Sequence, residues 1–312
     1  MNKAVCLMGP TASGKTDIAV RLCKRFPFDI ISVDSALVYR GMDIGTAKPD
    51  AETQRRTPHR LIDIRDPEER YSAGHFVRDA RREIDAILAL GRVPLLVGGT
   101  MMYFRALTGG IAELPAADPQ IRAAIDAEAE NSGWPAVHEQ LMAVDPEAAG
   151  RIKPNDRQRI QRALEVYRSS GRTLTDWQVA APALASNGIE FLKIALQPDT
   201  RQILHERIEQ RLNFMINNGF LDEVKVLRDR PDLTPEHPSM RSVGYRQLWQ
   251  HLDGETTLEE ARDKALFATR QLAKRQITWL RSEIGLLTFD PLEDDTIDAI
   301  SEHLIDFFKR LG

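Results

Sequence analysis

The chain has 312 residues and a net charge of −4, with 42% hydrophobic and 28% charged residues, which is typical of a globular protein with one or two cores. No segment approaches 18 uncharged apolar residues, and no basic region precedes a signal-type apolar stretch, so the sequence excludes a membrane-spanning chain and predicts no secretory signal. The two cysteines, Cys6 and Cys23, are expected to be buried thiols in a reducing compartment, which indicates a cytoplasmic protein.

Short apolar runs alternate with helical patterns along much of the chain. Strands are predicted at Ala4–Met8, Asp29–Val33, Leu61–Ile64, Pro94–Val97, Phe191–Leu196 and Leu286–Phe289, and helices near 16–25, 72–90 and 101–107. Ser72 has the character of a helix N-cap, and Gly91 is expected to end the same helix. The alternation predicts an α/β fold with a mostly parallel sheet and helices on both of its faces.

The pattern changes between Glu113 and about Ala185. This stretch has no strand-like run, and its helical segments are separated by prolines and glycines such as Pro115, Pro146 and Gly171. We expect an inserted all-helical domain over 113–185. Residues 1–112 and 186–312 are then expected to form the catalytic core with its C-terminal helices.

The most informative motif follows the first predicted strand. It has the pattern G-x-x-x-x-G-K-[ST] and reads Gly9-Pro10-Thr11-Ala12-Ser13-Gly14-Lys15-Thr16. In such a loop, backbone N–H groups and a helix N-terminus surround a phosphate. Lys15 adds a positive charge, and the hydroxyl of Thr16 is suited to hold Mg²⁺. Together with the strand–helix alternation, the motif predicts a P-loop NTPase-like α/β fold. It predicts a site for a di- or triphosphate but leaves open what happens to that phosphate.

Two further strand ends carry polar groups. Asp34-Ser35 follows the second strand and Gly98-Gly99-Thr100 follows the fourth, so a parallel sheet would bring both beside the phosphate loop. A P-loop ATPase usually has an Asp at the end of the fourth strand, and its absence here argues against a motor or switch. Asp34 is the carboxylate available as a general base. It could instead hold a metal-bound water or cap the next turn, and Thr100 could bond substrate or cap the following helix.

Basic residues are concentrated in two blocks despite the negative net charge. Residues 151–172 contain seven Lys or Arg against two acids, and residues 262–281 contain six against one. Such blocks indicate a local surface for a polyanion, although solvated helix faces would give the same pattern.

The phosphate loop and six motifs that follow it together resemble those of the tRNA dimethylallyltransferases. They run in order along the chain from the phosphate loop to residue 281, and Ser242 stands where relatives often have Cys. The motifs after the loop are Asp34-Ser35-Ala36-Leu37-Val38-Tyr39-Arg40-Gly41-Met42-Asp43-Ile44-Gly45-Thr46-Ala47-Lys48-Pro49, Pro58-His59-Arg60-Leu61, Leu96-Val97-Gly98-Gly99-Thr100, Asn155-Asp156-Arg157-Gln158-Arg159, Arg241-Ser242-Val243-Gly244-Tyr245-Arg246-Gln247 and Ala273-Lys274-Arg275-Gln276-Ile277-Thr278-Trp279-Leu280-Arg281.

The resemblance implies transfer of a dimethylallyl group from dimethylallyl diphosphate to the N6 amine of the adenosine that lies 3′ to the anticodon of tRNA. The phosphate loop would then hold the diphosphate leaving group rather than ATP. Asp34 would be the general base and Thr100 would orient the adenine. Lys15, a Mg²⁺ ion on Thr16 and Arg211 would stabilise the leaving group, with Arg207 as the alternative arginine.

The resemblance also assigns a tRNA-binding surface, which would grip the anticodon stem-loop in part through the helical insertion. A monomer is expected, with no membrane partner. The implied tRNA-binding residues are Asp34, Ser35, Ala36, Leu37, Thr100, Arg122, Gln158, Arg159, Ile160, Gln161, Arg162, Arg241, Ser242, Val243, Gly244, Tyr245, Arg246, Lys274, Arg275, Gln276 and Arg281.

Three other interpretations share part of this pattern. A nucleotide kinase has the same loop and a carboxylate after the second strand, but it needs no arginine-rich helices. An adenylate isopentenyltransferase uses free nucleotide and also needs no arginine-rich helices. An ATP-gated RNA-binding switch is disfavoured by the missing strand-end carboxylate. Without the resemblance, the residues indicate a P-loop enzyme that acts on RNA or nucleotide.

Overall fold

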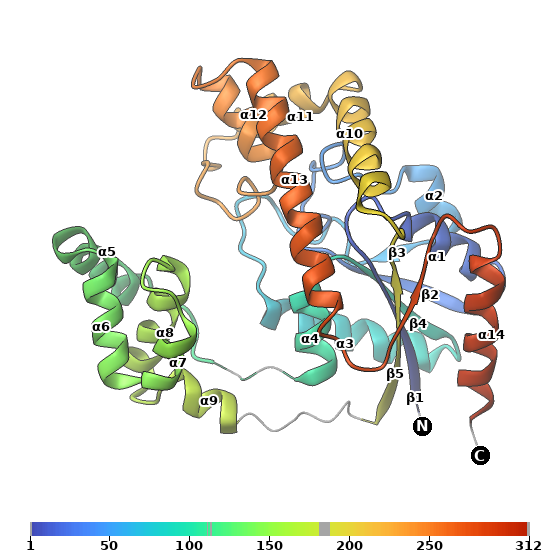
Figure 1. Ribbon diagram of the computed structural model, residues 1–312, viewed down its shortest axis with the longest axis horizontal. Helices are drawn as coiled ribbons and strands as arrows, with labels where there is room; N and C mark the ends of the chain where they lie inside the picture. Colours follow the sequence, from blue (N-terminus) through green and yellow to red (C-terminus); the bar gives the residue numbers. More distant parts are fainter. Residues whose placement is uncertain (1, 111, 113, 181–187, 311–312) are drawn as a thin grey trace. The chain divides into compact units, whose positions relative to one another are not determined.

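The computed structural model describes residues 2–110, 112, 114–180 and 188–310 (Figure 1). The chain divides into two compact units, one made of Met1–Thr108 with Gly188–Gly312 and the other of Gly109–Asn187. The predicted boundary residues 113 and 185 lie outside the described residues. Each unit has its own core and is described separately below.

The first unit is built on one six-stranded sheet with the order β3-β2-β4-β1-β5-β6 (Figure 1). All five strand pairs are parallel, which confirms the predicted fold class. The carboxyl ends of the strands therefore lie along one edge, where open α/β sheets bind ligands. The strands are β1 (Asn2–Met8), β2 (Phe28–Val33), β3 (His59–Arg60), β4 (Val93–Gly98), β5 (Ile189–Leu196) and β6 (Leu286–Phe289).

The helices of this unit include a long C-terminal set that the sequence indicated only in outline. The predicted N-cap is present, because the Ser72 hydroxyl accepts from the His75 N–H and Gly91 follows the helix with a φ of 69°. The helices are α1 (Lys15–Cys23), α2 (Ala51–Arg56), α3 (Ala73–Ala89), α4 (Met101–Gly109), α10 (Arg201–Asn217), α11 (Phe220–Arg228), α12 (Tyr245–Leu252), α13 (Leu258–Leu280) and α14 (Thr296–Lys309). None of the described helices is long and apolar enough to cross a membrane.

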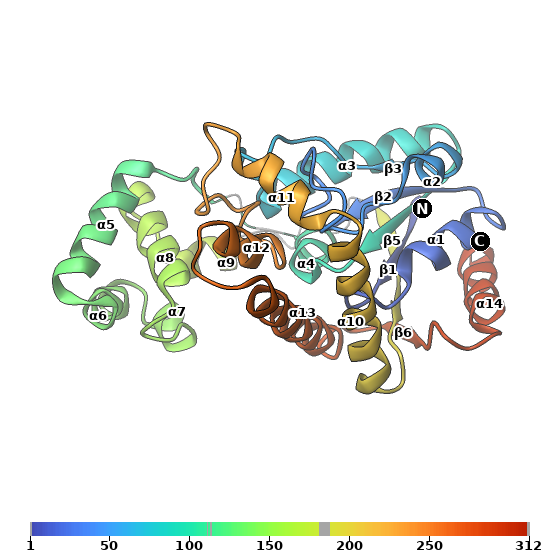
Figure 2. The same cartoon turned by 90° about the horizontal axis from the view of Figure 1, so that it is seen from above.

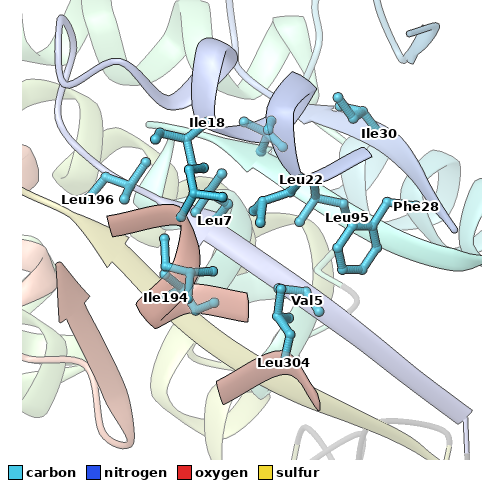
Figure 3. Packing of buried hydrophobic residues seen from close by; sticks show 14 of the residues in the cluster. Val5, Leu7, Ile18, Leu22, Phe28, Ile30, Leu95, Ile194, Leu196 and Leu304 are labelled. Carbon is cyan, nitrogen blue, oxygen red and sulfur yellow. The ribbon is translucent and has the colours of Figure 1, made fainter. Parts of the chain in front are cut away.

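The main core of the first unit lies between one face of the sheet and the helices α1 and α14. Val5 and Leu7 point to this face because side chains two apart on a strand share a side. Leu22 of α1 and Leu304 of α14 pack against them (Figure 3). The C-terminal helix is therefore part of the core that supports the central strand.

The opposite face of the sheet is covered as well. Cys6 and Leu96, which alternate with residues of the first face, are fully buried. Helix α3 packs on β2 and β4 at this face, and Figure 2 shows α3 and α14 on opposite sides of the strands. The strands are thus buried on both faces, as their nearly continuous apolar runs predict.

One strand prediction is wrong. Leu61–Ile64 was expected to be extended, but the strand is His59–Arg60, and Leu61 and Asp63 have left-handed φ angles of 64° and 56°. The reason is a long-range ion pair, since the buried ammonium of Lys48 contacts the Asp63 carboxylate at 2.5 Å and the Tyr39 carbonyl at 2.9 Å. A turn that brings Asp63 to Lys48 replaces the strand.

The second unit consists of helices and connecting loops, with no strand among its described residues. Three of its helices begin at aspartates, because Asp118, Asp145 and Asp156 each cap a helix with a carboxylate oxygen. Ile125, Leu141 and other apolar side chains form a separate core. The helices are α5 (Pro119–Ser132), α6 (Trp134–Val144), α7 (Pro146–Arg151), α8 (Arg157–Ser170) and α9 (Leu174–Ala180).

The packing of α14 gives a direct test of its place in the core. Leu304→Ala should lower the free energy of unfolding by about 2–4 kcal/mol, because it removes buried side-chain volume beneath β1. Ile305→Ala is the matched control, since Ile305 is the next residue and is 42% exposed. Urea unfolding followed by circular dichroism measures both. Equal losses for the two variants would contradict the assignment of α14 to the core.

Candidate active site

The phosphate loop joins β1 to α1 and contains two residues in the left-handed region. Gly14, which precedes α1, has a φ of 91°, and Ala12 has a φ of 64°. Glycine adopts this conformation freely, but alanine pays about 1 kcal/mol for it. The Lys15 ammonium lies back across the loop and donates to the Pro10 carbonyl at 2.6 Å. A strained loop of this kind needs support from other elements.

Two arginines of α10 supply part of that support. Arg207 donates through Nε to the Ala12 carbonyl at 2.9 Å, and Arg211 donates to the Thr11 hydroxyl. They are four residues apart, so they lie on one face of the helix. The sequence analysis left Arg207 and Arg211 as alternatives for the arginine that stabilises the leaving group. The structure brings both to the loop.

The loop carries more positive than negative charge. The pKa of Lys15 is lowered to about 7, first by burial and then by the charge of Arg211, while Asp34 acts in the opposite direction. Burial also lowers the pKa of Arg211, with Asp34 opposing this shift and Arg207 adding to it. An anion bound at the loop would relieve this repulsion and favour the charged form of Lys15.

Asp34 and Thr100 meet beside the loop, as the strand order predicts. Asp34 Oδ1 accepts from the N–H groups of Ala36 at 2.8 Å and Leu37 at 3.3 Å, so one oxygen does cap the next turn. Among the described residues, none donates a hydrogen bond to Oδ2. The Thr100 hydroxyl accepts from the Ser35 N–H at 3.1 Å and so braces the same turn. This second carboxylate oxygen of Asp34 is therefore left for a ligand at the edge of the sheet.

A cavity of about 480 Å³ adjoins these groups. Its polar lining includes Thr11, Asp34, Thr100 and Arg211. The rest of its wall is largely apolar, a feature that the sequence analysis missed. The signal was the spacing of Ile208, Leu212 and Met215 around Arg211 on one helical face. The apolar lining residues include Ile208, Leu212, Met215, Phe220, Val243, Leu272 and Trp279.

One wall of the cavity is fixed by Glu223, which the sequence analysis also missed. Its carboxylate accepts from three successive backbone N–H groups, those of Asp43 at 2.8 Å, Ile44 at 2.6 Å and Gly45 at 3.1 Å. The Tyr245 hydroxyl donates to the same carboxylate at 2.5 Å, and the pKa of Tyr245 is raised well above its ordinary value by burial and by this negative charge. No local pattern in the sequence links residues 43–45 to Glu223.

Many of the other predicted site residues of the first unit line the same cavity. Gln276 is 9% exposed, and its side chain bonds the phosphate loop and the end of β4. Other predicted residues lie outside the cavity lining. Three of them, Arg246, Lys274 and Arg281, are exposed basic residues, and Lys15, Thr16 and Leu37 also lie outside it. The predicted residues in the lining, besides Thr11, Asp34, Thr100 and Arg211, are Ser35, Ala36, Arg241, Ser242, Val243, Gly244, Tyr245, Arg275 and Gln276.

The predicted residues of the second unit divide by helix face. Gln158 and Arg159 are exposed, whereas Ile160 is fully buried in the core of this unit. Gln161 donates to Asp126 at 2.7 Å. Arg162 is engaged within the unit, as described next.

Arg122 and Arg162 both neutralise a fully buried carboxylate, that of Glu165. Arg122 donates to it at 2.8 Å and 3.0 Å, and Arg162 donates at 2.7 Å. Burial alone would raise the pKa of Glu165, but the hydrogen bonds from both arginines and the Asp118 N–H hold that pKa below its ordinary value. These two arginines therefore stabilise the fold of the second unit, whatever else they bind.

Comparisons with known proteins show the family of this chain. The IPP transferase family model matches residues 37–283, and the isopentenyl transferase model matches residues 2–69. The chain belongs to the IPP transferase family. The tRNA dimethylallyltransferases of Burkholderia cenocepacia (strain HI2424) and Ralstonia pickettii (strain 12J) are each 53% identical to it over 306 residues, which cover 96% of this chain and 94% of each relative. The resemblance noted in the sequence is thereby confirmed.

Solved structures show the same likeness. The tRNA isopentenylpyrophosphate transferase of Bacillus halodurans matches with a TM-score of 0.72 and 37% identity, over 98% of this chain and 96% of the other. The tRNA delta(2)-isopentenylpyrophosphate transferase of Staphylococcus epidermidis matches with a TM-score of 0.70 and 31% identity, over 98% and 100%. A eukaryotic dimethylallyltransferase acting on tRNA shares the fold, with a TM-score of 0.82 at 24% identity over 100% of this chain and 81% of that chain.

The buried carboxylate of the second unit predicts unequal effects of two neighbouring arginines. Arg162→Ala should lower the free energy of unfolding by about 1–3 kcal/mol, because it leaves Glu165 short of a partner. The loss should shrink as the pH falls below the ordinary range of a glutamate carboxyl, because protonation then neutralises Glu165, whose pKa in the folded protein is held below that range. Exposed Arg159 is the control, and Arg159→Ala should change stability by less than about 0.5 kcal/mol. Urea unfolding measures both, and equal effects would exclude this role.

The lowered pKa of Lys15 predicts pH-dependent binding of anions. Above about pH 7 the free amine must take up a proton when an anion binds, so affinity should fall by up to about tenfold per pH unit. Isopentyl diphosphate, which is unreactive and fully ionised above about pH 7.5, is a suitable probe for calorimetry. Lys15→Met should weaken binding and abolish this slope. A wild-type affinity that stays constant between about pH 7.5 and 9 would contradict the prediction.

Proposed function

We propose that this chain transfers a dimethylallyl group from dimethylallyl diphosphate to the N6 amine of the adenosine 3′-adjacent to the anticodon in tRNA. The products are N6-isopentenyladenosine and diphosphate. The observation that carries the proposal is the meeting of Arg211, Asp34 and an apolar wall in one cavity. The names of the relatives, which are tRNA dimethylallyltransferases, support the same reaction.

The lining of the cavity fits a donor with a charged head and a short apolar tail. Arg211 contacts the phosphate loop, and Met215 lies one helical turn further along α10, a rise of about 6 Å. The longest carbon chain of a dimethylallyl group has four carbons, so the group fits within this rise. We place the diphosphate at the loop and the dimethylallyl group against Met215, Leu212 and Phe220.

The positive charges at the loop would act on the leaving group. Negative charge grows on the diphosphate as its bond to carbon breaks, and charges fixed in advance stabilise it without reorganisation. Lys15, Arg207 and Arg211 are the cations available at the loop. Their effect is larger in the transition state than in the bound donor, which is the condition for raising the rate.

Mg²⁺ fits the same site as a cofactor. Within the described part of the chain, no cluster of three or more His, Cys, Asp or Glu side chains forms a dedicated metal cage. The exposed hydroxyl of Thr16 lies in the first turn of α1, and Mg²⁺ commonly takes one or two protein oxygens together with phosphate oxygens. Bound there, the ion would neutralise charge on the diphosphate.

Asp34 would act as the general base on the acceptor. The exocyclic amine of adenine is a poor nucleophile because its lone pair is delocalised into the ring. Asp34 Oδ2 would accept a proton from this amine as it attacks, while Oδ1 stays bonded to the turn that holds the carboxylate in place. Thr100, whose hydroxyl accepts from the Ser35 N–H, would orient the adenine ring.

The acceptor must leave the stack of the anticodon loop to reach Asp34, and single-stranded loops are where proteins read RNA sequence. We assign the exposed basic residues Arg246, Lys274 and Arg281 to the RNA surface of the first unit. Gln158 and Arg159 are the exposed candidates on α8 of the second unit. The proposal also includes a monomer in the cytoplasm.

The test is an incubation of the purified chain with Mg²⁺, labelled dimethylallyl diphosphate and unmodified tRNA, followed by nucleoside analysis. Parallel incubations contain ATP, or adenosine monophosphate as an alternative acceptor. Label in isopentenyladenosine would support the proposal. ATP consumption without labelled nucleoside would overturn it and favour a kinase or ATPase. Label on free adenosine monophosphate but not on tRNA would favour a nucleotide isopentenyltransferase.

Replacing the base should remove chemistry but not RNA binding. Asp34→Asn should lower the rate constant of transfer by about 10²–10⁴-fold, since the amide cannot take the proton. Its affinity for tRNA should stay within about twofold of the wild type, because phosphate contacts dominate that affinity. Asp17→Asn is the control, since Asp17 is an exposed carboxylate on α1. Transfer by Asp34→Asn within a few-fold of the wild type would exclude Asp34 as the base.

The two exposed residues of α8 offer a matched pair for the RNA surface. Arg159→Ala should weaken tRNA binding and reduce the slope of log affinity against log salt by about 1, as the loss of one phosphate contact requires. Gln158→Ala removes a neutral neighbour and should leave the slope unchanged. Filter binding across a salt series measures both. An unchanged slope for Arg159→Ala would remove Arg159 from the RNA surface.

A further inference from the structure

Gln276 forms a bridge between α13 and two parts of the active site. Its Oε1 accepts from the Thr11 N–H of the phosphate loop at 2.8 Å. Its Nε2 donates to the Gly99 carbonyl, at the end of β4, at 2.8 Å. The side chain is largely buried, so both bonds form away from water and are costly to lose.

The end of β4 is shaped to admit this bridge. A Cβ on Gly99 would lie 2.5 Å from Gln276 Nε2 and 3.2 Å from the Gly9 carbonyl oxygen. Any larger residue at this position would force the Gln276 amide out of its present place. The absence of a side chain at Gly99 is therefore what allows the Gln276 amide to reach both partners.

The same turn of α13 presents opposite faces to the loop and to solvent. Lys274 and Arg275 are exposed, whereas Gln276 and the next residue, Ile277, are buried. A helix turn is rigid, so a ligand that fixes the basic side chains also fixes the position of the Gln276 amide. The loop residue Thr11 is held by this amide and, through its hydroxyl, by Arg211 of α10.

We propose that Gln276 couples RNA binding on α13 to diphosphate binding at the phosphate loop. RNA that restrains α13 would also restrain the Thr11 backbone through the Gln276 hydrogen bond, so the loop would lose less freedom when the donor binds. Linkage then requires the donor to tighten RNA binding by the same factor. Gln276 is a positioning residue in this scheme, because it acts on the donor through Thr11. The proposal rests on the RNA-binding role of α13 proposed above.

The test is a thermodynamic cycle. The dissociation constant of isopentyl diphosphate, an unreactive probe, is measured with Mg²⁺ in the presence and absence of a saturating anticodon stem-loop RNA. The ratio compared is the dissociation constant without RNA divided by that with RNA. For the wild type it should be about 5–20, a typical size for coupling between sites. Gln276→Met keeps the length of the side chain but removes both hydrogen bonds, and its ratio should fall to about 1–2.

Two further variants make the cycle specific. Gln271→Met is the matched control, because it makes the same replacement elsewhere on α13, and its ratio should equal that of the wild type. Gln276→Glu keeps the acceptor for the Thr11 N–H but loses the donor to Gly99, so it should retain part of the coupling. This variant also serves if Gln276→Met does not fold.

The outcomes separate coupling from mere stability. A purely structural role would lower the melting temperature and weaken both ligands while leaving the ratio intact, and that result would overturn the proposal. A wild-type ratio of about 1, with both ligands bound, would overturn the coupling but not the proposed function. Failure of the wild type to bind the RNA would overturn both.

Discussion

The active site depends on the capture of one short loop by helices from the other end of the chain. The loop includes a left-handed Ala12, a conformation that its own sequence does not favour. Arg207, Arg211 and Gln276 hold the loop through Ala12 and Thr11. The phosphate site is therefore not a property of the N-terminal motif alone. Changes in α10 or α13 that never touch a ligand should still alter it.

Helix α10 has a second task, because it carries both the charged and the apolar part of the cavity wall. Arg211 and Met215 are one turn apart, so the helix itself fixes the separation between an anionic head and a short tail. Glu223 fixes a facing segment through three backbone N–H groups. The cavity is thus defined by rigid elements on several sides, which suits a reaction that needs accurate positioning.

Local patterns predicted the sheet, the phosphate loop and the meeting of Asp34 with Thr100, because strand ends of a parallel sheet converge whatever the rest of the chain does. Leu61–Ile64 was misjudged because a distant lysine decides its conformation. Local patterns could not predict the contacts of Glu223 and Gln276 for the same reason, since these contacts join segments that only the tertiary fold brings together. The run around Ile160 was treated as one RNA-binding block, although helical periodicity places that side chain in a core.

The order of pairing in the sheet has a consequence for synthesis on the ribosome. The central strand β1 pairs with β4 on one side and with β5 on the other, and residues 109–187, with their own helical core, are translated between those partners. One edge of β1 therefore stays unpaired until β5 has been synthesised. The helical unit, whose contacts are local, can form before that. Closure of the sheet is a late, non-local step, and slow elongation before residue 189 would prolong the exposure of an apolar strand edge to aggregation.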